Sequence, residues 1–348
     1  MTTFLSPIAA PDAASAALAR ARQDTLTKPA GSLGQLEALA CRFAGWQGKV
    51  QPAPLQPAIT LFAADHGVTD EGVSAFPQAV TAEMVKNFAA GGAAICVLAR
   101  QHGARLEVVD AGVAGDLSGL PIVHAKVRRA SANLRREAAL SLAEAEAALA
   151  VGRDAARRAV EAGANLLVAG DMGIGNTTPS AALICRLSGA APEIVVGRGT
   201  GVDDAGLALK RRVVEDALAR LAGRELAALE VLAELGGLEI AAIAGFYLEG
   251  AALGVPSLVD GFITSAAALV AKALQPAVAD WLIASHRSQE TGHGIALETL
   301  GLTPLVELGL RLGEGSGAAL CLPLLQSAIL LHNEMATFAE AGVSEKAE

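Results

Sequence analysis

Short apolar runs alternate with alanine-rich helical stretches from about residue 57 onward. Five runs are rich in Val, Ile or Leu and end in polar, turn-forming residues, which is typical of β-strands: AITLFAADHG, RLEVVDAG, NLLVAGDMG, PSLVDG and WLIASHRS. A sixth run, EIVVGRG, is a further candidate. One intervening helix is marked by a capping box of Ser141 and Glu144. The alternation predicts an α/β fold in which helices wrap a parallel sheet.

Both ends of the chain show helical patterns instead. Residues 12–44 predict two helices, the second opening at a capping box of Ser32 and Gln35. Near the C-terminus, SGAALCLPLLQSAILLHNEMATFAEAG predicts a long helix with a bend at Pro323. We expect the two ends to form one small helical domain. The predicted division of the chain is 1–45 for the N-terminal helices, 46–300 for the α/β domain and 301–348 for the C-terminal loop and helix.

Composition narrows the classes of protein to consider. A hydrophobic content of 52% with only 3% aromatic residues predicts a large core of Ala, Leu, Val and Ile. The formal net charge of −9 argues against a nucleic-acid partner, since such proteins display basic surface. The four cysteines form no CxxC pair, so we expect buried free thiols rather than disulfides or a zinc site.

The chain is expected to be a cytoplasmic protein without a membrane partner. Its first residues, MTTFLSPIAAPDAAS, lack the basic segment followed by an apolar one that marks a secretory signal. Apolar runs such as AALCLPLLQSAILL are shorter than the roughly 20 residues that span a bilayer.

Polar residues follow the predicted strands. Because ligands of open parallel sheets bind beyond the carboxyl ends of the strands, these side chains are expected to face one crevice: Asp65, His66, Asp110, Asp171, Asp260, His286 and Ser288. The alternative for any one strand is that its Asp or Gly simply begins the next turn or helix cap. Five strands in a row favour a shared site.

The segment GDMGIGNTTPSAAL, residues 170–183, is the strongest local signal. A strand runs into a glycine-rich turn before a helix resumes, so backbone N–H groups and hydroxyls are available to bind an anion such as phosphate. The residues of this turn are Gly173, Gly175, Asn176, Thr177 and Thr178. The segment has neither the P-loop lysine nor the G-x-G-x-x-G spacing. The alternative is an ordinary glycine-rich turn with a threonine cap.

A second glycine-rich loop, in VGRGTGVDDAGLALKRR, is followed by Lys210. Lys210 either supplies the positive charge that the Gly173–Thr178 turn lacks or belongs to a solvated helix face. Upstream, Asp65, His66, Asp70 and Glu71 lie close together, but no spacing typical of metal ligands is present, so no metal is expected. The remaining histidines, outside any motif, are expected at the surface or at helix caps: His102, His124, His293 and His332.

The segment RLGEGSGAAL places Glu314 between two glycines. If Ser316 caps the following helix, Glu314 lies just before its N-terminus, where the helix dipole favours an ionised carboxylate. The flanking glycines allow a flat ligand to approach the backbone closely. The alternative is a solvent-exposed acid in a flexible loop.

Six motifs together resemble those of the nicotinate-nucleotide–dimethylbenzimidazole phosphoribosyltransferase family, which assembles the lower-ligand nucleotide of cobalamin. They stand in that family's order and cover nearly the whole chain: KPAGSLGQLE, ADHGV, GDMGIGNTTP, DGF, SHRSQE and RLGEGSGAAL. The resemblance implies a Rossmann-like, mostly parallel sheet flanked by helices, with a small helical domain built from both chain ends. It also implies a homodimer.

The resemblance further implies transfer of a phosphoribosyl group from nicotinate mononucleotide to 5,6-dimethylbenzimidazole, with inversion at C1′ and without a cofactor or metal. Glu314 matches the family's general base. Phosphate and ribose contacts are implied for Gly173, Gly175, Asn176, Thr177, Thr178 and Lys210. Asp260, Ser288 and Leu312 are implied to line the crevice.

Two departures from the family pattern stand out. Asp171 occupies a position where the family carries Glu, so a carboxylate that assists catalysis from that side reaches one methylene less far. Phe76 and Met84 match the wall of the base pocket and are apolar where at least one member is polar. They predict a more apolar pocket that also accepts other flat bases, such as substituted benzimidazoles, adenine or phenols.

Two other functions are compatible with the residues. A metal-dependent hydrolase would use Asp65, His66, Asp110 and Asp171. A nucleotide-sensing or base-binding module would keep the same pocket without chemistry. Dependence on added metal separates the first from the transferase, and the effect of Glu314→Ala on turnover separates the second.

Overall fold

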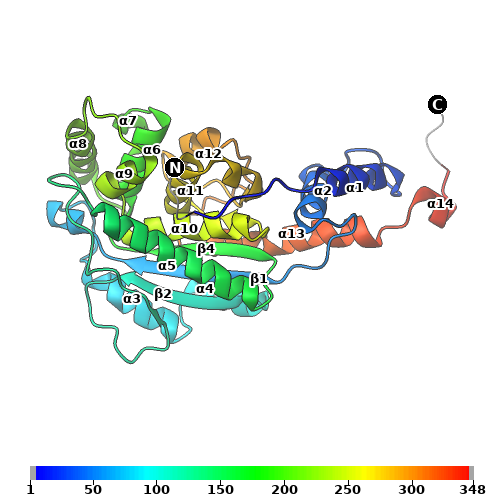
Figure 1. Ribbon diagram of the computed structural model, residues 1–348, viewed down its shortest axis with the longest axis horizontal. Helices are drawn as coiled ribbons and strands as arrows, with labels where there is room; N and C mark the ends of the chain where they lie inside the picture. The colour runs from blue at the N-terminus through cyan, green and yellow to red at the C-terminus, as the bar shows by residue number, and fades with distance from the viewer. Residues whose placement is uncertain (1–4, 345–348) are drawn as a thin grey trace.

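The computed structural model describes residues 5–344, and its centre is a six-stranded parallel sheet with the strand order β3-β2-β1-β4-β5-β6 (Figure 1). The five main predicted strands are confirmed. The strands are β1 (Pro57–Ala64), β2 (Arg105–Gly112), β3 (Val123–His124), β4 (Leu166–Met172), β5 (Ser257–Val259) and β6 (Leu282–Ala284). Since β1 has β2 on one side and β4 on the other, the crossover changes direction at β1.

The predicted sixth strand, EIVVGRG, is wrong. Its first three residues belong to the short helix α7 (Pro192–Val195), which begins one residue earlier. Pro192 is in the first turn of the helix, where its fixed φ and missing N–H suit a helix start. The sixth strand is instead β3, whose two residues pair with Val109 and Asp110 of β2.

Helices cover both faces of the sheet. One face packs against α10 (Leu238–Ala252), which lies along α5 (Leu142–Glu161), and the other against α3 (Ala79–Ala89) and α4 (Ala94–Gln101) (Figure 1). Helix α5 begins at the predicted capping box. The backbones of α5 and α10 touch, because a Cβ on Gly152 would overlap the carbonyl oxygen of Ala242. Glycine is therefore required at this crossing.

The remaining helices connect the strands or extend the chain ends. They are η1 (Gly67–Glu71), α6 (Thr177–Ser188), α8 (Asp204–Ala219), α9 (Ala228–Leu235), α11 (Phe262–Leu274), η2 (Pro276–Trp281), α12 (His293–Leu300) and α14 (Phe338–Ala341).

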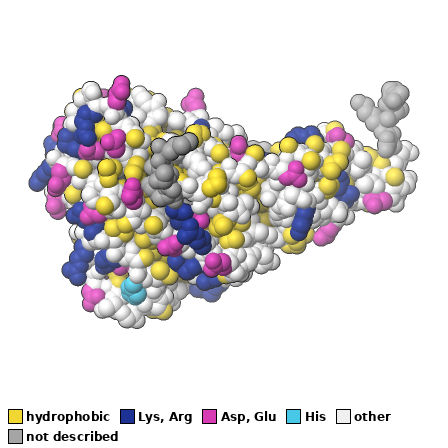
Figure 2. All heavy atoms as spheres, viewed as in Figure 1, with side chains coloured by type: hydrophobic (Ala, Val, Ile, Leu, Met, Phe, Trp, Pro, Cys, Tyr) yellow, Lys and Arg dark blue, Asp and Glu magenta, His cyan; other side chains and the backbone are white. Residues whose placement is uncertain are grey.

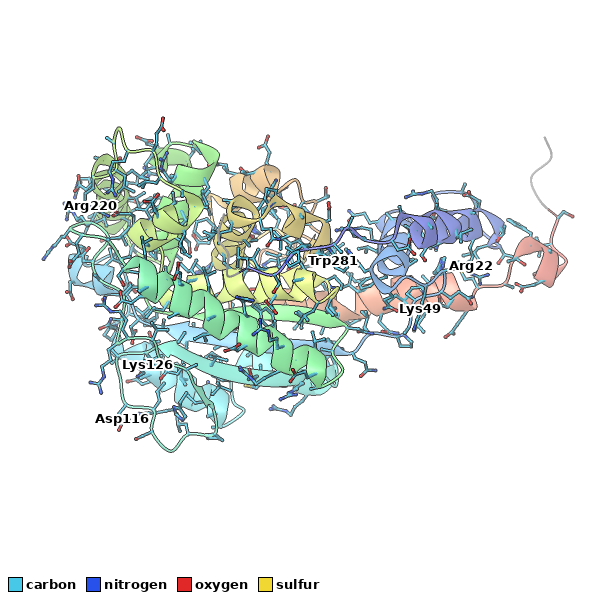
Figure 3. All side chains as sticks on the ribbon, in the orientation of Figure 1. Arg22, Lys49, Asp116, Lys126, Arg220 and Trp281 are labelled. Carbon is cyan, nitrogen blue, oxygen red and sulfur yellow. The ribbon has the colours of Figure 1, made fainter. Side chains whose placement is uncertain are left out.

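Helices from both chain ends form an arm that projects from the sheet domain (Figure 1). The arm consists of α1 (Ala13–Thr25), α2 (Gln35–Gln47) and the outer part of α13 (Ser316–Glu334). Helix α13 continues through Pro323, as predicted. The bend at Pro323 and the exact domain boundaries remain predictions. Trp281 marks the junction with the sheet domain: its indole N–H donates to the carbonyl of Ala9 at 3.0 Å, and its ring stacks on Trp46 (Figure 3).

Two local predictions in the arm are wrong. Helix α2 starts at Gln35 itself behind Gly34, without a side-chain cap, so Ser32 and Gln35 form no capping box. The turn is held instead by Glu37, which accepts the N–H of Leu33 at 3.0 Å and pairs with Lys28 at 2.8 Å. His332 is fully buried rather than at the surface, because its two ring nitrogens contact Gln23 and the carbonyl of Val50.

One segment, Ala79–Gln101, is long and apolar enough by composition to cross a membrane, with a mean hydropathy of 1.3. The secondary structure divides it into α3 and α4 at Gly91 and Gly92, and both helices pack against the sheet. It is thus no continuous membrane-spanning helix in this fold. The four cysteines are buried free thiols, as predicted. Figure 2 shows Lys and Arg side chains together with Asp and Glu side chains over the visible face.

Candidate active site

The polar residues predicted to follow the strands gather at the carboxyl edge of the sheet, and most are buried there. Two of them serve the backbone. Asp65 accepts the N–H of Ala114 at 2.8 Å, and Asp110 accepts that of Val113 at 2.8 Å. Both carboxylates therefore hold the loop after β2, which is the turn-forming role left open by the sequence.

The glycine-rich turn after β4 has a tightly constrained backbone. Gly175 has a left-handed φ of +89°, and a Cβ on Gly173 would lie 2.5 Å from the carbonyl oxygen of Ala64. Asn176 donates from its side-chain amide to Asp171 at 3.0 Å, which ties the loop to the strand. Thr178 is fully buried.

Lys210 lies next to this turn although it comes from α8. Its ammonium group donates to the hydroxyl of Thr177 at 2.9 Å, and the side chain is only 1% exposed. The solvated helix face considered for Lys210 is therefore wrong. Burial lowers the pKa of Lys210 to about 8, opposed by the negative charge of Glu290. No salt bridge to a carboxylate within residues 5–344 neutralises it, so a buried cation lies at the mouth of the turn.

Glu314 adopts a left-handed backbone with φ of +64°, between Gly313 at +85° and Gly315 at +84°. This segment lies directly on β4, because a Cβ on Gly170 would overlap the carbonyl oxygen of Glu314. The side chain is 6% exposed, and one carboxylate oxygen accepts the N–H of Ile95 at 3.2 Å. Burial raises the pKa of Glu314, and the Ile95 amide opposes this increase.

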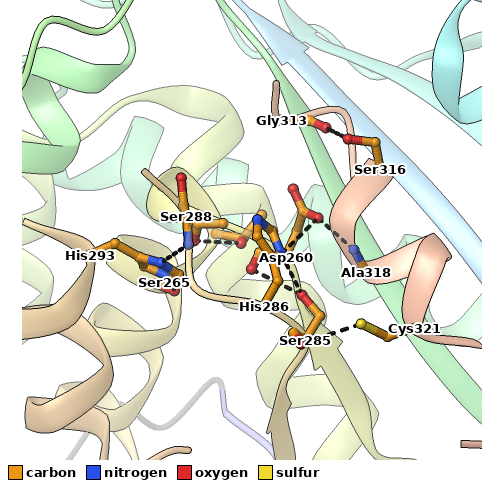
Figure 4. A network of polar contacts seen from close by, with 12 residues as sticks. Asp260, Ser265, Ser285, His286, Ser288, His293, Gly313, Ser316, Ala318 and Cys321 are labelled. Carbon is orange, nitrogen blue, oxygen red and sulfur yellow. Dashed lines mark hydrogen bonds and ion pairs between the residues drawn. The ribbon is translucent and has the colours of Figure 1, made fainter. Parts of the chain in front are cut away.

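Ser316 does not cap α13, contrary to the prediction. It is the first residue of the helix behind Gly315, and its hydroxyl donates backwards to the carbonyl of Gly313 at 2.7 Å. The N-terminus of α13 is bound instead by Asp260, which accepts the N–H of Ala318 at 2.7 Å (Figure 4). The two acids thus bind different helix ends: Asp260 that of α13 and Glu314 that of α4.

Several carboxyl groups lie close enough to repel one another. The pKa of Asp171 is raised to about 8, first by burial and then by the negative charge of Asp260, with smaller effects from Glu239 and Glu314. Burial also raises the pKa of Asp260 to about 7, against the amides that lower it. Asp171 therefore retains a proton near neutral pH, because its ionised form would be buried and close to other carboxylates.

Glu239 belongs to this cluster and was missed in the sequence. It is fully buried in α10 and lies 2.7 Å from His66 Nε2, and the pKa of His66 is raised by Glu239 and Asp65 against the opposing effect of burial. The available signal was an acid within an otherwise apolar helical stretch, GGLEIAAIAGF. An acid at such a position needs a buried partner.

The loop after β6 carries Ser288 and is held by His293 (Figure 4). His293 Nδ1 accepts the backbone N–H of Ser288 at 2.8 Å, so Nε2 carries the proton and donates to Ser265 at 3.0 Å. Burial lowers the pKa of His293 to about 3. The predicted surface position of His293 is wrong, because it is a neutral buried histidine that shapes the loop.

The three predicted apolar contacts lie on segments beside these loops. Phe76 and Leu312 are exposed, and Met84 is half-buried in α3. Thr81 in the same helix accepts the N–H of Ile174 from the glycine-rich turn at 3.0 Å. Helix α3 therefore begins next to the turn.

Two further observations delimit the site. Within residues 5–344 no group of three or more His, Cys, Asp or Glu side chains is arranged to hold a metal ion. A groove of about 760 Å³ lies elsewhere, between α2 and the segments around β6, and is lined by Arg42, Trp46 and Leu302 among others. None of the predicted site residues lines that groove, so its volume says nothing about their chemistry.

The raised pKa of Asp171 predicts a pH-dependent stability. Between about pH 4 and 8 the folded state keeps a proton that the unfolded chain has released, so Asp171 lowers the stability as the pH rises through this window. Asp171→Asn removes this effect. The free energy of unfolding of the variant minus that of wild type should therefore increase by more than about 1 kcal/mol between pH 4 and pH 9. Urea unfolding at several pH values measures it. Asp24 is exposed, so Asp24→Asn serves as the control, and its free energy of unfolding should change with pH as that of wild type does. The same pH dependence in Asp171→Asn would contradict the assignment.

Comparison with known proteins adds independent information. A family model described as a phosphoribosyltransferase matches residues 8–343. The chain is 76% identical over 328 residues to the nicotinate-nucleotide–dimethylbenzimidazole phosphoribosyltransferase of Chromobacterium violaceum, covering 94% of this chain and 95% of the relative. It is 54% identical over 338 residues to the enzyme of the same name from Xanthomonas euvesicatoria, with 97% of both chains covered.

Solved structures agree. The crystal structure of the correspondingly named enzyme from Thermus thermophilus is similar with a TM-score of 0.92 and 51% identity, covering 96% of this chain and 100% of that one. The parallel sheet flanked by helices is therefore the fold of these proteins as well. Since the match extends over nearly the whole length of chain and relatives alike, this chain is an enzyme that belongs to the nicotinate-nucleotide–dimethylbenzimidazole phosphoribosyltransferase family.

Proposed function

We propose that this enzyme transfers the 5-phosphoribosyl group of nicotinate mononucleotide to 5,6-dimethylbenzimidazole, giving α-ribazole 5′-phosphate and nicotinate. The names of its relatives support the two substrates. The observation that carries the mechanism is the buried carboxylate of Glu314, held in a left-handed conformation at the carboxyl edge of the sheet.

The reaction needs a base at one atom. One ring nitrogen of the benzimidazole forms a bond to the ribose C1′ while the bond from C1′ to the nicotinate nitrogen breaks, and that electron pair leaves with nicotinate. The other ring nitrogen loses its proton, which Glu314 accepts. Attack from the face opposite the departing nicotinate inverts C1′.

The phosphate and ribose are proposed to bind at the glycine-rich turn. Lys210 and Thr177 present an ammonium group and a hydroxyl at its mouth, and the turn adds backbone N–H groups. Gly173, Gly175 and Asn176 shape the turn, and Asp260 and Ser288 line the opposite side of the crevice. The buried position of Thr178 supports a structural rather than a direct role.

Asp171 is proposed to assist Glu314 rather than to replace it. The two acids repel each other, and a Cβ on Gly313 would lie 3.4 Å from both carboxyl oxygens of Asp171, which places this acid under the Glu314 loop. A protonated Asp171 leaves the negative charge to Glu314 and stabilises it as a hydrogen-bond donor or dipole.

Replacing the base should abolish turnover without abolishing binding. Glu314→Gln should reduce nicotinate release from nicotinate mononucleotide and dimethylbenzimidazole by roughly 10²- to 10⁴-fold, because it keeps the shape but accepts no proton. Calorimetry should show nearly unchanged binding of nicotinate mononucleotide. Glu298→Gln, exposed on α12, serves as the control.

The other possible functions give different results in this assay. Equal release by wild type and Glu314→Gln would assign the base to another residue. Binding by wild type without any release would favour the sensing module. Activity lost on treatment with EDTA would favour the metal-dependent hydrolase.

We further propose that Phe76 and Met84 give the acceptor pocket an apolar wall. Wild type should then use substituted benzimidazoles, adenine or phenols as well as dimethylbenzimidazole, since an apolar wall selects for flat shape rather than for hydrogen-bonding groups. Phe76→Ser with Met84→Gln should alter the ranking of these bases by about tenfold. Competition between paired bases, read by chromatography of the products, measures the ranking. Turnover with dimethylbenzimidazole alone would contradict the proposal.

The enzyme is proposed to be a homodimer. Leu320 and Leu324 lie one turn apart on α13 with exposed side chains, and Val97 is exposed on α4, which packs against α13. Such an apolar surface on adjoining helices is typical of an interface between subunits.

The dimer can be tested by placing charge in this surface. Leu320→Glu with Leu324→Glu should convert a dimer into a monomer, because burial of two carboxylates is unfavourable. Light scattering after size-exclusion chromatography measures the mass. Leu142→Glu, also an exposed leucine but on α5, should leave the dimer intact. A monomeric wild type would refute the proposal.

A further inference from the structure

The carboxylate of Glu314 is held from a helix 219 positions away in the chain. Its Oε2 accepts the backbone N–H of Ile95 at 3.2 Å. Ile95 is the second residue of α4, so its N–H is one of those at the helix start that have no acceptor within the helix. The N-cap residue, Ala93, has no side chain that could serve as acceptor, so Glu314 fills that role.

Both partners of this hydrogen bond have fixed backbones. The side chain of Ile95 is fully buried in the core, which holds the start of α4 in place. Glu314 is held in the left-handed region, which is unfavourable for a non-glycine residue, by its contact with Gly170 on β4. With both ends fixed, the bond orients the carboxylate.

The groups around Glu314 make this amide electrostatically important. Asp171 on β4 and Glu314 repel each other electrostatically. Asp260 after β5 and Glu239 on α10 also repel Asp171, and Arg311 on the segment of Glu314 is exposed. No cation within residues 5–344 forms an ion pair with Glu314. The positive end of α4 is the polar group bound to its carboxylate.

We propose that Ile95 is a positioning residue for the transfer reaction, and that its backbone amide orients the Glu314 carboxylate toward the benzimidazole proton. This rests on the proposed role of Glu314 as the base. The amide also favours the ionised carboxylate. The start of α4 therefore affects both the orientation and the ionisation of Glu314. Helix α4 is thus part of the site through its backbone, without a polar side chain.

Proline substitution removes this amide, and an alanine variant controls for the side chain that is lost with it. The N–H of Ile95 makes no hydrogen bond within α4. Ile95→Pro therefore removes the hydrogen bond to Glu314 and keeps the backbone hydrogen bonds of the helix. Ile95→Ala removes most of the side chain but keeps the amide. Ala94→Pro places a proline at the exposed first position of the same helix and also keeps the Ile95 amide.

The readout is the pH dependence of kcat/KM together with kcat, KM and the thermal midpoint of each variant. Ile95→Pro should lower kcat roughly ten- to hundredfold, the usual effect of a lost hydrogen bond to a charged group. The acidic limb of its pH profile of kcat/KM should move to higher pH, because burial raises the pKa of Glu314 and the Ile95 amide no longer opposes that increase. The KM for nicotinate mononucleotide should change less than about twofold. Ala94→Pro should resemble wild type, and Ile95→Ala should keep the position of the acidic limb.

A second measurement covers the case in which Ile95→Pro does not fold. In wild type labelled with ¹⁵N-isoleucine, the Ile95 amide resonance should shift with pH as Glu314 titrates, and in Glu314→Gln it should not. A resonance that does not move in wild type would overturn the proposal, as would an acidic limb of Ile95→Pro that coincides with that of Ile95→Ala. The roles of Glu314 and Ile95 are tested separately. If Glu314→Gln retains full turnover, Glu314 is not the base, whatever the effect of the Ile95 variants.

Discussion

The site depends on the direct contact between the Gly313–Gly315 segment and the middle strand β4. A Cβ on Gly170 would overlap the backbone of Glu314, and Glu314 itself has a left-handed φ. The absence of a side chain at Gly170 therefore brings the loop before α13 onto the strand. This contact places Glu314 above Asp171 and aims its carboxylate at the start of α4.

The contact also explains how a site rich in acids is tolerated. Burying several carboxylates together is unfavourable unless each finds a donor or keeps its proton. Asp260 binds the N-terminus of α13, Glu314 binds that of α4, and Glu239 pairs with His66. Asp171 accepts a hydrogen bond from the side-chain amide of Asn176, and its pKa is raised to about 8, compared with about 7 for Asp260.

Groups of opposite charge come from different segments around the site. The acids lie around β4 and β5, while the buried ammonium of Lys210 lies at the glycine-rich turn next to Thr177. A ligand with a negative phosphate and a cationic ring is complementary to these groups, because the phosphate can meet Lys210 while the ring meets the acids. The pyridinium nucleotide of the proposed reaction has this distribution.

The sequence by itself determined the five main strands, the helix at Ser141, the two helical chain ends and the motifs that identify the family, because hydrophobic period, caps and glycine-rich turns are local signals. The sequence leaves Lys210 between two interpretations, because its contact with Thr177 forms only in the folded chain. The run EIVVGRG predicts a strand, but a short apolar run does not reveal that the preceding proline starts a helix. For Glu239 the sequence shows only an acid in an apolar stretch and not its partner, and it gives no signal for the roles of His293 and the Ile95 amide. Their roles come from partners that only tertiary folding brings within bonding distance, and burial alone decides whether such a polar group needs one.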